Sequence, residues 1–320
     1  MVQPMLLQPA FKDYLWGGER LKTDFGKQTA IAPLAESWEL SCHPDGESTI
    51  ASGPFAGQTL AAALQAQPEL LGSAVDAKDG FPLMIKLIDA KQSLSVQVHP
   101  DDEYAARVEH SRGKTEMWVI VDCEPGAELL YGFSRPVTRE ELACRIKDGT
   151  LLEVAGHAPV HPGDVFFIPA GTLHAIGAGI LIAEIQQSSN VTYRVYDYDR
   201  RDKNGNTRPL HIEKALDVLR LTPSPAAGRP QGQPERLPGC TRTLLQSCGY
   251  FTVTRMDVDG TFGITVGGDR FAHLLCIDGE GELICGDTRL PVTKGGSVFL
   301  PAGCGDVTLC GKLTLLHTTP

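Results

Sequence analysis

Residues 163–171 read GDVFFIPAG, and residues 295–303 read GGSVFLPAG. Each copy is a short apolar run typical of a strand, followed by a Pro-Ala-Gly turn. Similar short runs, bounded by Gly, Pro or Asp, recur along most of the chain. A repeat of this kind in a chain rich in short strands predicts two related β-barrels.

The remaining elements indicate a mainly β fold with a few short helices. Helices are predicted over residues 57–72, from the capping box Thr138-x-x-Glu141 to about residue 149, and over 211–219. Residues 11–42 read as irregular. Strands are predicted at 83–88, 94–99, 117–121, 126–131, 151–154, 164–168, 179–186, 191–197, 250–257, 262–266, 272–277, 281–285, 289–292, 297–300 and 306–317.

Residues 221–240 are rich in Pro, Gly and Gln and read as a linker. This predicts a first domain over residues 1–220, with short helical insertions, and a second domain over residues 241–320. Each domain would contain one copy of the repeat.

Several polar side chains interrupt the apolar runs of the first domain. Gln97 and His99 are two residues apart, so a strand would present both on one face. Glu116 opens a later apolar run, and His174 follows the first repeat copy. Together these four would form a mixed nitrogen and oxygen site typical of zinc or a similar divalent ion.

The second repeat copy lacks these ligands. Asp306 occupies the position equivalent to His174, and nothing after residue 240 resembles the Gln97-x-His99 pair. We therefore expect the second barrel to be degenerate and free of metal.

The composition limits the classes of partner and compartment. The chain has 320 residues, is 42% hydrophobic and 21% charged, and carries a formal net charge of −10, which disfavours nucleic acid as a partner. We expect no signal peptide and no membrane contact, because no apolar stretch reaches spanning length. Nine cysteines without a C-x-x-C motif indicate reduced thiols in a cytoplasmic protein. A monomer or a weak homo-oligomer is expected.

Four motifs together resemble one family. They are Gln-Val-His-Pro-Asp-Asp from residue 97, Gly-Lys-Thr-Glu-Met-Trp from 113, Ile-Pro-Ala-Gly-Thr-Leu-His-Ala-Ile from 168, and Glu-Ile-Gln-Gln-Ser-Ser-Asn-Val-Thr-Tyr-Arg from 184. The set is similar to type I mannose-6-phosphate isomerase in its short bacterial form, a member of the cupin superfamily of jelly-roll barrels. The resemblance spans about residues 11–220. The region 240–320 fits that family's metal-free cupin domain more loosely.

The resemblance implies a zinc-dependent isomerase that interconverts mannose 6-phosphate and fructose 6-phosphate through a cis-enediol. It implies one Zn²⁺ per chain and assigns the residues of the site. The zinc ligands would be Gln97, His99, Glu116 and His174; the catalytic residues would be Lys114, Arg194 and Glu184; and Trp16 and Asn190 would contact the sugar phosphate. Longer family members have Asp where this chain has Asn190, so an acid or base role of that Asp does not transfer.

This reaction needs an oxyanion stabiliser, a general base and a cationic group for the substrate. Glu184 is the first choice for the base, because it would share a buried strand face with Ile180 and Ile182, and burial would raise its pKa. Lys114 and a water molecule at the metal are the alternatives.

Two other functions are compatible with part of the pattern. A cupin dioxygenase with an iron site would use two histidines and one carboxylate, but would leave Gln97, Lys114 and Arg194 unexplained as a set. A non-catalytic sugar-binding double cupin would not need Lys114 and Arg194 beside a metal.

Overall fold

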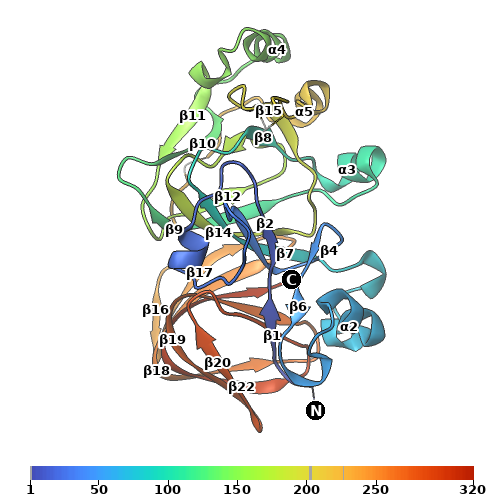
Figure 1. Cartoon of the computed structure of the whole chain (residues 1–320), viewed down its shortest axis with the longest axis vertical. Helices are drawn as coiled ribbons and strands as arrows, with labels where there is room; N and C mark the ends of the chain where they lie inside the picture. Colours follow the sequence, from blue (N-terminus) through green and yellow to red (C-terminus); the bar gives the residue numbers. More distant parts are fainter. Residues whose placement is uncertain (1, 202–203, 226) are drawn as a thin grey trace.

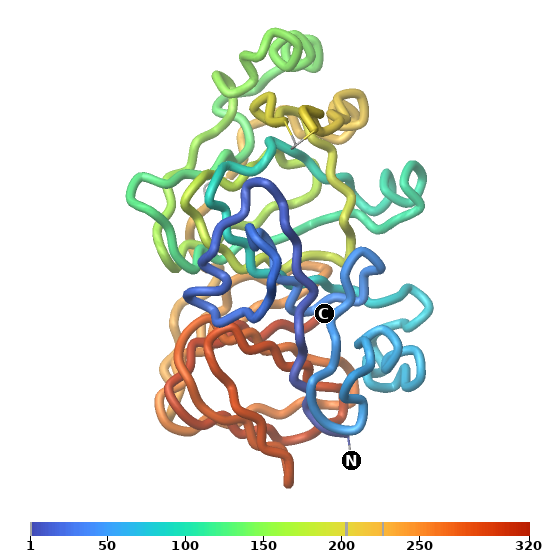
Figure 2. Tube along the Cα trace, in the orientation of Figure 1, coloured from blue at the N-terminus to red at the C-terminus, as the bar shows by residue number. Residues whose placement is uncertain are grey.

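The computed structural model describes residues 2–201, 204–225 and 227–320. Two β-rich units are stacked along the long axis of the molecule (Figure 1). The upper unit consists mainly of residues from the first two-thirds of the chain, and the lower one is built largely from the last third, as the colours of the trace in Figure 2 show. Within the described residues, no helix has the length and apolar character needed to cross a membrane.

The upper unit contains two sheets. The six-stranded sheet has the order β12-β9-β14-β7-β3-β2. Its strands are β2 (Ala10–Lys12), β3 (Glu36–Leu40), β7 (Leu83–Ala90), β9 (Glu116–Cys123), β12 (Val165–Ile168) and β14 (Ile180–Gln187). The five-stranded sheet has the order β11-β10-β13-β8-β15. Its strands are β8 (Val96–Val98), β10 (Glu128–Phe133), β11 (Ala155–Pro159), β13 (His174–Ala175) and β15 (Tyr193–Tyr196).

Strand alternation gives the six-stranded sheet two buried faces. Trp118, Ile120 and Ile182 point to one side and pack with Phe166 and Trp16 in the core of the upper unit. The opposite side packs against the lower unit in a second core. That core includes Ile85, Leu87, Met117, Val119, Ala183 and Ile185 from the sheet, and Phe251, Phe271, Leu275 and Phe299 from the lower unit. A sheet buried on both faces leaves its polar residues little access to water.

The lower unit is a sheet with the order β16-β17-β18-β22-β19-β21-β1-β6, with β20 paired to β19. Its strands are β1 (Met5–Gln8), β6 (Thr49–Ile50), β16 (Glu235–Leu237), β17 (Cys240–Ser247), β18 (Thr252–Val266), β19 (Ala272–Cys285), β20 (Thr288–Thr293), β21 (Ser297–Leu300) and β22 (Gly305–Thr319). Two strands from the start of the chain therefore belong to this sheet, and Met5 pairs with Phe299 across β1 and β21. The division at residues 221–240 stays a prediction.

The helices are short and lie around the sheets. They are α1 (Arg20–Thr23), α2 (Leu60–Ala66), α3 (Asp102–Glu109), α4 (Arg139–Lys147) and α5 (Ile212–Val218), with 3-10 turns at Gly53–Phe55, Pro68–Leu71, Ala77–Asp79 and Leu151–Glu153. A two-stranded ribbon joins β4 (Cys42–His43) to β5 (Gly46–Glu47). Thr138 caps α4 by accepting the Glu141 N–H at 3.1 Å, as the capping box predicts.

The mainly β fold is confirmed, and three details are wrong. The predicted strand at 151–154 is a 3-10 turn, with the strand following at Ala155–Pro159. The segment 11–42 contains the fully buried strand β3 rather than only irregular structure. The strands predicted at 250–257 and 262–266 form one strand, as do those at 272–277 and 281–285, because the glycines that were read as turns lie inside long strands.

Candidate active site and metal centre

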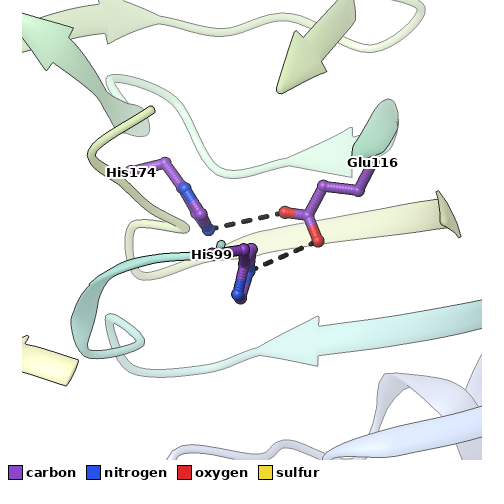
Figure 3. A group of neighbouring side chains, drawn as sticks. All are labelled: His99, Glu116 and His174. Carbon is purple, nitrogen blue, oxygen red and sulfur yellow. Dashed lines mark ion pairs between the residues drawn. The ribbon is translucent and has the colours of Figure 1, made fainter. Parts of the chain in front are cut away.

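Three of the predicted ligands meet at one point between the two sheets of the upper unit. His174 opens β13, Glu116 opens β9, and His99 follows β8 (Figure 3). Their candidate ligand atoms all lie within 4.8 Å of one another. His99 Nε2 is 3.6 Å from Glu116 Oε2, and His174 Nε2 is 3.5 Å from Glu116 Oε1. Each side chain is at most 1% exposed, so the cluster is closed to bulk water on most sides.

The other ring nitrogen of each histidine is already engaged. His99 Nδ1 lies 2.8 Å from the Val191 carbonyl, and His174 Nδ1 lies 2.9 Å from the Thr172 carbonyl. A carbonyl can only accept, so each Nδ1 carries the proton and each Nε2 presents a lone pair to Glu116. This arrangement is typical of metal-binding histidines. Burial lowers the pKa of His174 to about 4 and holds that of His99 well below its usual value, so both rings are neutral at pH 7.

Gln97 reaches the same cluster from the strand next to β13. It pairs with His174 in the register of the five-stranded sheet, and its side-chain nitrogen lies 3.3 Å from His174 Nε2. A half-turn of the amide would bring its oxygen to that position. The structure thus brings all four predicted ligands together.

The buried carboxylate of Glu116 tests whether these residues fit a metal. Within the described residues Oε1 has no hydrogen-bond donor, and Oε2 has only the ion pair with Lys114 Nζ at 2.8 Å. Burial, with the nearby charge of Glu184, raises the pKa of Glu116 to about 7. A divalent ion would satisfy both oxygens together with two imidazole lone pairs. Within residues 2–201, 204–225 and 227–320, this is the one cluster of three or more His, Cys, Asp or Glu side chains suited to a metal, and Asp306 is not part of it.

A row of buried charges of alternating sign leads away from the cluster. Lys114 Nζ lies 3.7 Å from Glu184 Oε1, and Glu184 Oε1 lies 3.4 Å from Lys86 Nζ. Lys86 in turn lies 3.5 Å from Glu36. These residues come from the adjacent strands β14, β7 and β3 and from the segment entering β9, so the pairing of the sheet fixes the row. Every member is less than 10% exposed.

The pKa of Glu184 differs from the sequence expectation. Burial does act to raise it, but the charges of Lys114 and Lys86 and the hydrogen bond from Trp118 outweigh burial and hold the pKa below its usual value. The Trp118 indole N–H donates to Glu184 Oε2 at 2.9 Å. The predicted rise is therefore wrong, because the strand pairing that brings Lys86 and Lys114 beside this carboxylate cannot be read from the local sequence pattern. Glu184 is ionised at neutral pH, as a general base must be.

The row forms part of the wall of a cavity of about 240 Å³. Predicted site residues that line it are Trp16, Gln97, Lys114, Glu184, Asn190 and Arg194. Trp16 is 3% exposed and stacks on Tyr14 with ring centroids 5.5 Å apart. Asn190 lies at the rim, where its amide donates to Asp45 at 2.8 Å. The cavity thus reaches the His99–Glu116–His174 cluster through two neighbouring side chains in its wall, Gln97 and Lys114.

Arg194 extends from β15 beside Gln97. Its Nε donates to the Ser95 hydroxyl at 3.2 Å, and its Nη1 donates to the Pro209 carbonyl at 3.0 Å. His211 holds the backbone of Arg194 from both sides: the His211 N–H donates to the Arg194 carbonyl at 2.8 Å, and the Arg194 N–H donates to His211 Nδ1 at 3.2 Å. The position of this guanidinium is therefore fixed by main chain as well as side chain.

Sequence reasoning missed four residues that line the cavity: Glu36, Lys86, Tyr14 and Arg208. Lys86 carried a signal, because a charged residue inside the apolar run Leu83-Met84-Ile85-Lys86-Leu87-Ile88 must find a buried partner. The sequence around Arg208 offers no such signal, since one more charged residue after a charged turn does not stand out. It is held by Asp197, which accepts from its Nε at 2.7 Å and its Nη2 at 2.6 Å.

Comparison with known proteins gives consistent matches at the levels of domain, chain and structure. Residues 5–121 match the family model for the catalytic domain of type I phosphomannose isomerase, and residues 241–320 match that for the cupin domain of mannose-6-phosphate isomerase. The chain is 39% identical to mannose-6-phosphate isomerase ManA of Bacillus subtilis, covering 97% of this chain and 96% of that protein. It is 38% identical to mannose-6-phosphate isomerase of Streptococcus mutans, with coverage of 94% and 93%.

Solved structures give the same result. The crystal structure of the mannose 6-phosphate isomerase from Bacillus subtilis superposes with a TM-score of 0.92 at 37% identity, covering 99% of both chains. A structure of phosphomannose isomerase from Salmonella typhimurium superposes with a TM-score of 0.80 at 17% identity, which supports the fold alone.

Proposed function

Since the chain belongs to the mannose-6-phosphate isomerase family and is an isomerase, we propose that it interconverts mannose 6-phosphate and fructose 6-phosphate with one zinc ion bound by Gln97, His99, Glu116 and His174. The observation that carries this proposal is the convergence of two imidazole lone pairs on the buried carboxylate of Glu116. The nine free thiols of the chain are typical of a reducing compartment, so we propose that the protein is cytoplasmic.

The ligand set explains the choice of metal. Two neutral imidazoles, one amide and one carboxylate leave a divalent ion with a net positive charge, and zinc accepts such mixed ligands. When bound there, zinc supplies a Lewis acid that stabilises negative charge on the carbonyl oxygens of the sugar.

Glu184 is proposed as the base that moves the proton. Its ionised carboxylate removes the proton from C2 of the open-chain aldose, and the C–H electron pair forms the C1–C2 double bond of the enediol while the carbonyl electrons move to O1. The O2 hydroxyl proton then passes to O1, the O2 electrons form the C2 carbonyl, and the double-bond electron pair takes up the removed proton at C1, which yields the ketose. Lys86 and Lys114 flank the carboxylate at 3.4 and 3.7 Å and keep it charged until the substrate arrives.

The phosphate requires cations that still have free donors. Arg208 uses Nε and Nη2 on Asp197, and Arg194 uses Nε and Nη1 on Ser95 and Pro209. Among the residues that the structure describes, the other terminal nitrogen of each has no hydrogen-bond partner, and we assign it to the substrate. Burial and the nearby charge of Arg208 lower the pKa of Arg194, so the two guanidinium groups repel each other until an anion binds. A sugar phosphate dianion would relieve this repulsion and be held at the rim.

The direct test is a coupled assay for fructose 6-phosphate formed from mannose 6-phosphate. We expect turnover that is lost on treatment with a chelator and restored by Zn²⁺. Arg194→Ala should abolish turnover while zinc remains bound, because Arg194 is not a ligand. Full activity in metal-free protein, or oxygen uptake by an iron-loaded sample without isomerisation, would contradict the proposal and favour the dioxygenase alternative.

A further inference from the structure

We propose that the lower unit positions Lys114 and Glu116 through the phenol of Tyr250, which acts on the carboxylate of Asp102. The role of Lys114 and Glu116 in the active site rests on the proposed function. The connection from Tyr250 to these two residues rests on hydrogen bonds alone. It gives a unit that contributes none of the four proposed zinc ligands a role in the active site.

Tyr250 lies in the turn between β17 and β18 of the lower unit and is 37% exposed. Its hydroxyl donates to Asp102 Oδ2 at 2.8 Å. Asp102 is the first residue of α3 in the upper unit and stands three residues after His99. Burial, followed by the hydrogen bond to Asp102, raises the pKa of Tyr250 to about 12, so the phenol keeps its proton and remains a donor.

The second oxygen of Asp102 holds the segment that enters β9. Asp102 Oδ1 accepts the Gly113 N–H at 2.8 Å and the Gln187 side-chain amide at 2.9 Å. The Gln187 side-chain oxygen then accepts the Thr115 N–H at 2.8 Å. Asp102 therefore fixes the backbone N–H groups on both sides of Lys114, one directly and one through Gln187.

The backbone of Lys114 is held as well, since its N–H donates to the Pro100 carbonyl at 3.0 Å. Gly113 makes the approach between these segments possible: a Cβ atom there would lie 2.4 Å from the Asp101 carbonyl carbon. The two segments thus pack backbone to backbone, and a shift of Asp102 must move the Lys114 backbone with it. The Lys114 ammonium stands 2.8 Å from Glu116, so the shift reaches the metal cluster.

Tyr250 fixes the orientation of the Asp102 carboxylate because both carboxylate oxygens accept hydrogen bonds. With the phenol present, one oxygen is directed at the lower unit and the other at Gly113 and Gln187. Without it, Oδ2 would turn to water, and the carboxylate would be free to rotate away from Gly113. Tyr250 is a positioning residue, since it touches neither the ligands nor the cavity that contains Lys114.

The test compares Tyr250→Phe with Tyr104→Phe. Tyr104 is a matched control, because its hydroxyl also donates to an aspartate, Asp217, at 3.0 Å, and it lies on the same helix α3. We expect hydrogen exchange of the metal-free protein over residues 111–117 to be about tenfold faster in Tyr250→Phe than in wild type, since loss of a hydrogen bond to a charged group has about that effect. Exchange in Tyr104→Phe should be unchanged.

Zinc transfer to a chromogenic chelator should also be faster in Tyr250→Phe, and kcat for mannose 6-phosphate should fall about five- to twentyfold while KM changes less. The effect of Tyr250→Phe should vanish in an Asp102→Asn background, because both act through one carboxylate. Equal exchange rates and equal zinc transfer in the two phenylalanine variants would overturn the proposal. These two measurements use no substrate, so they stand apart from any failure of the proposed isomerase reaction.

Discussion

Lys86 Nζ lies 3.4 Å from Glu184 Oε1, and the two residues are direct register partners across β7 and β14. Lys86 is 3% exposed and is also 3.5 Å from Glu36. It therefore neutralises two buried carboxylates at once. Burial acts against its charge, but Glu36 and Glu184 outweigh burial and raise its pKa, so Lys86 remains an ammonium group throughout the working range.

Lys86→Gln should lower both stability and activity, because it leaves two buried carboxylates without their common cation. Breaking a buried pair of this kind costs about 3–5 kcal/mol of unfolding free energy. Urea unfolding and the coupled assay measure the two effects. Both Lys86 and Lys12 stand over the Trp38 ring, at 4.7 and 4.4 Å from its centroid. Lys12→Gln is therefore the control, since Lys12 forms no ion pair with Glu36 or Glu184. Equal stability of the two variants would show that the pair contributes little.

Removing the metal should lower the melting temperature of wild type, and Zn²⁺ should restore it. Free metal at 100 times its dissociation constant adds about 2.7 kcal/mol to the unfolding free energy. Glu116→Gln should abolish this response, because it removes the anionic ligand. Glu128→Gln removes a surface carboxylate that also pairs with a histidine, His157 at 2.7 Å, and should respond like wild type. A zinc response retained by Glu116→Gln would place the metal elsewhere.

Glu184→Gln should stop exchange of the C2 proton of mannose 6-phosphate with solvent, since an amide cannot accept that proton. Exchange can be followed by NMR in deuterated buffer, independently of product formation. Glu36→Gln is the matched control: Glu36 also accepts an indole N–H, from Trp38 at 2.6 Å, and also contacts Lys86. It should retain measurable exchange. Normal exchange in Glu184→Gln would assign the base to another group.

Arg208→Gln should raise KM for mannose 6-phosphate about 10- to 100-fold with a smaller change in kcat, because it removes a charge-assisted contact to the phosphate. Any turnover of unphosphorylated mannose should be unaffected. Arg135→Gln, which breaks the surface pair with Glu141, provides the control. If KM were unchanged in Arg208→Gln, the phosphate would have to bind at another part of the cavity.

Acid should destabilise the lower unit through His317. Burial lowers the pKa of this ring to about 4, against 6.5 in the unfolded chain, so the folded state binds fewer protons. Its contribution to stability is present above pH 6.5 and is lost as the pH falls toward 4, at up to about 1.4 kcal/mol per pH unit. His317→Gln should flatten the fall in unfolding free energy between pH 6 and pH 4, measured by urea titration.

Much of the site could be predicted because its candidate ligands lie in motifs with fixed spacing. Gln97, His99, Glu116 and His174 converge as the strand pattern and the resemblance implied. Lys86 and Arg208 were missed because neither belongs to a motif. Their roles depend on register partners and turns that bring distant residues together, as when Asp197 holds Arg208. The direction of the Glu184 pKa shift was wrong for the same reason.

Most elements that depend on a local sequence pattern were predicted correctly. Those that depend on pairing between distant segments were missed. The repeat and the period-two alternation gave the strands. The strand β3 was overlooked because Glu36 and Glu39 interrupt its apolar pattern, and the lysines that neutralise them, Lys86 and Lys27, lie outside the strand. No local signal placed β1 beside β21.

Because β1 pairs with β21 of the lower unit, the two units are difficult to express as separate proteins. If the chain were divided within residues 221–240 and the pieces expressed singly, the C-terminal piece would lack the partner of Phe299, Val298 and Ser297. It would then offer an uncovered apolar strand edge, which recruits other chains and promotes aggregation. To keep the C-terminal piece soluble, both pieces would have to be co-expressed, or residues 2–8 would have to be fused to the C-terminal piece.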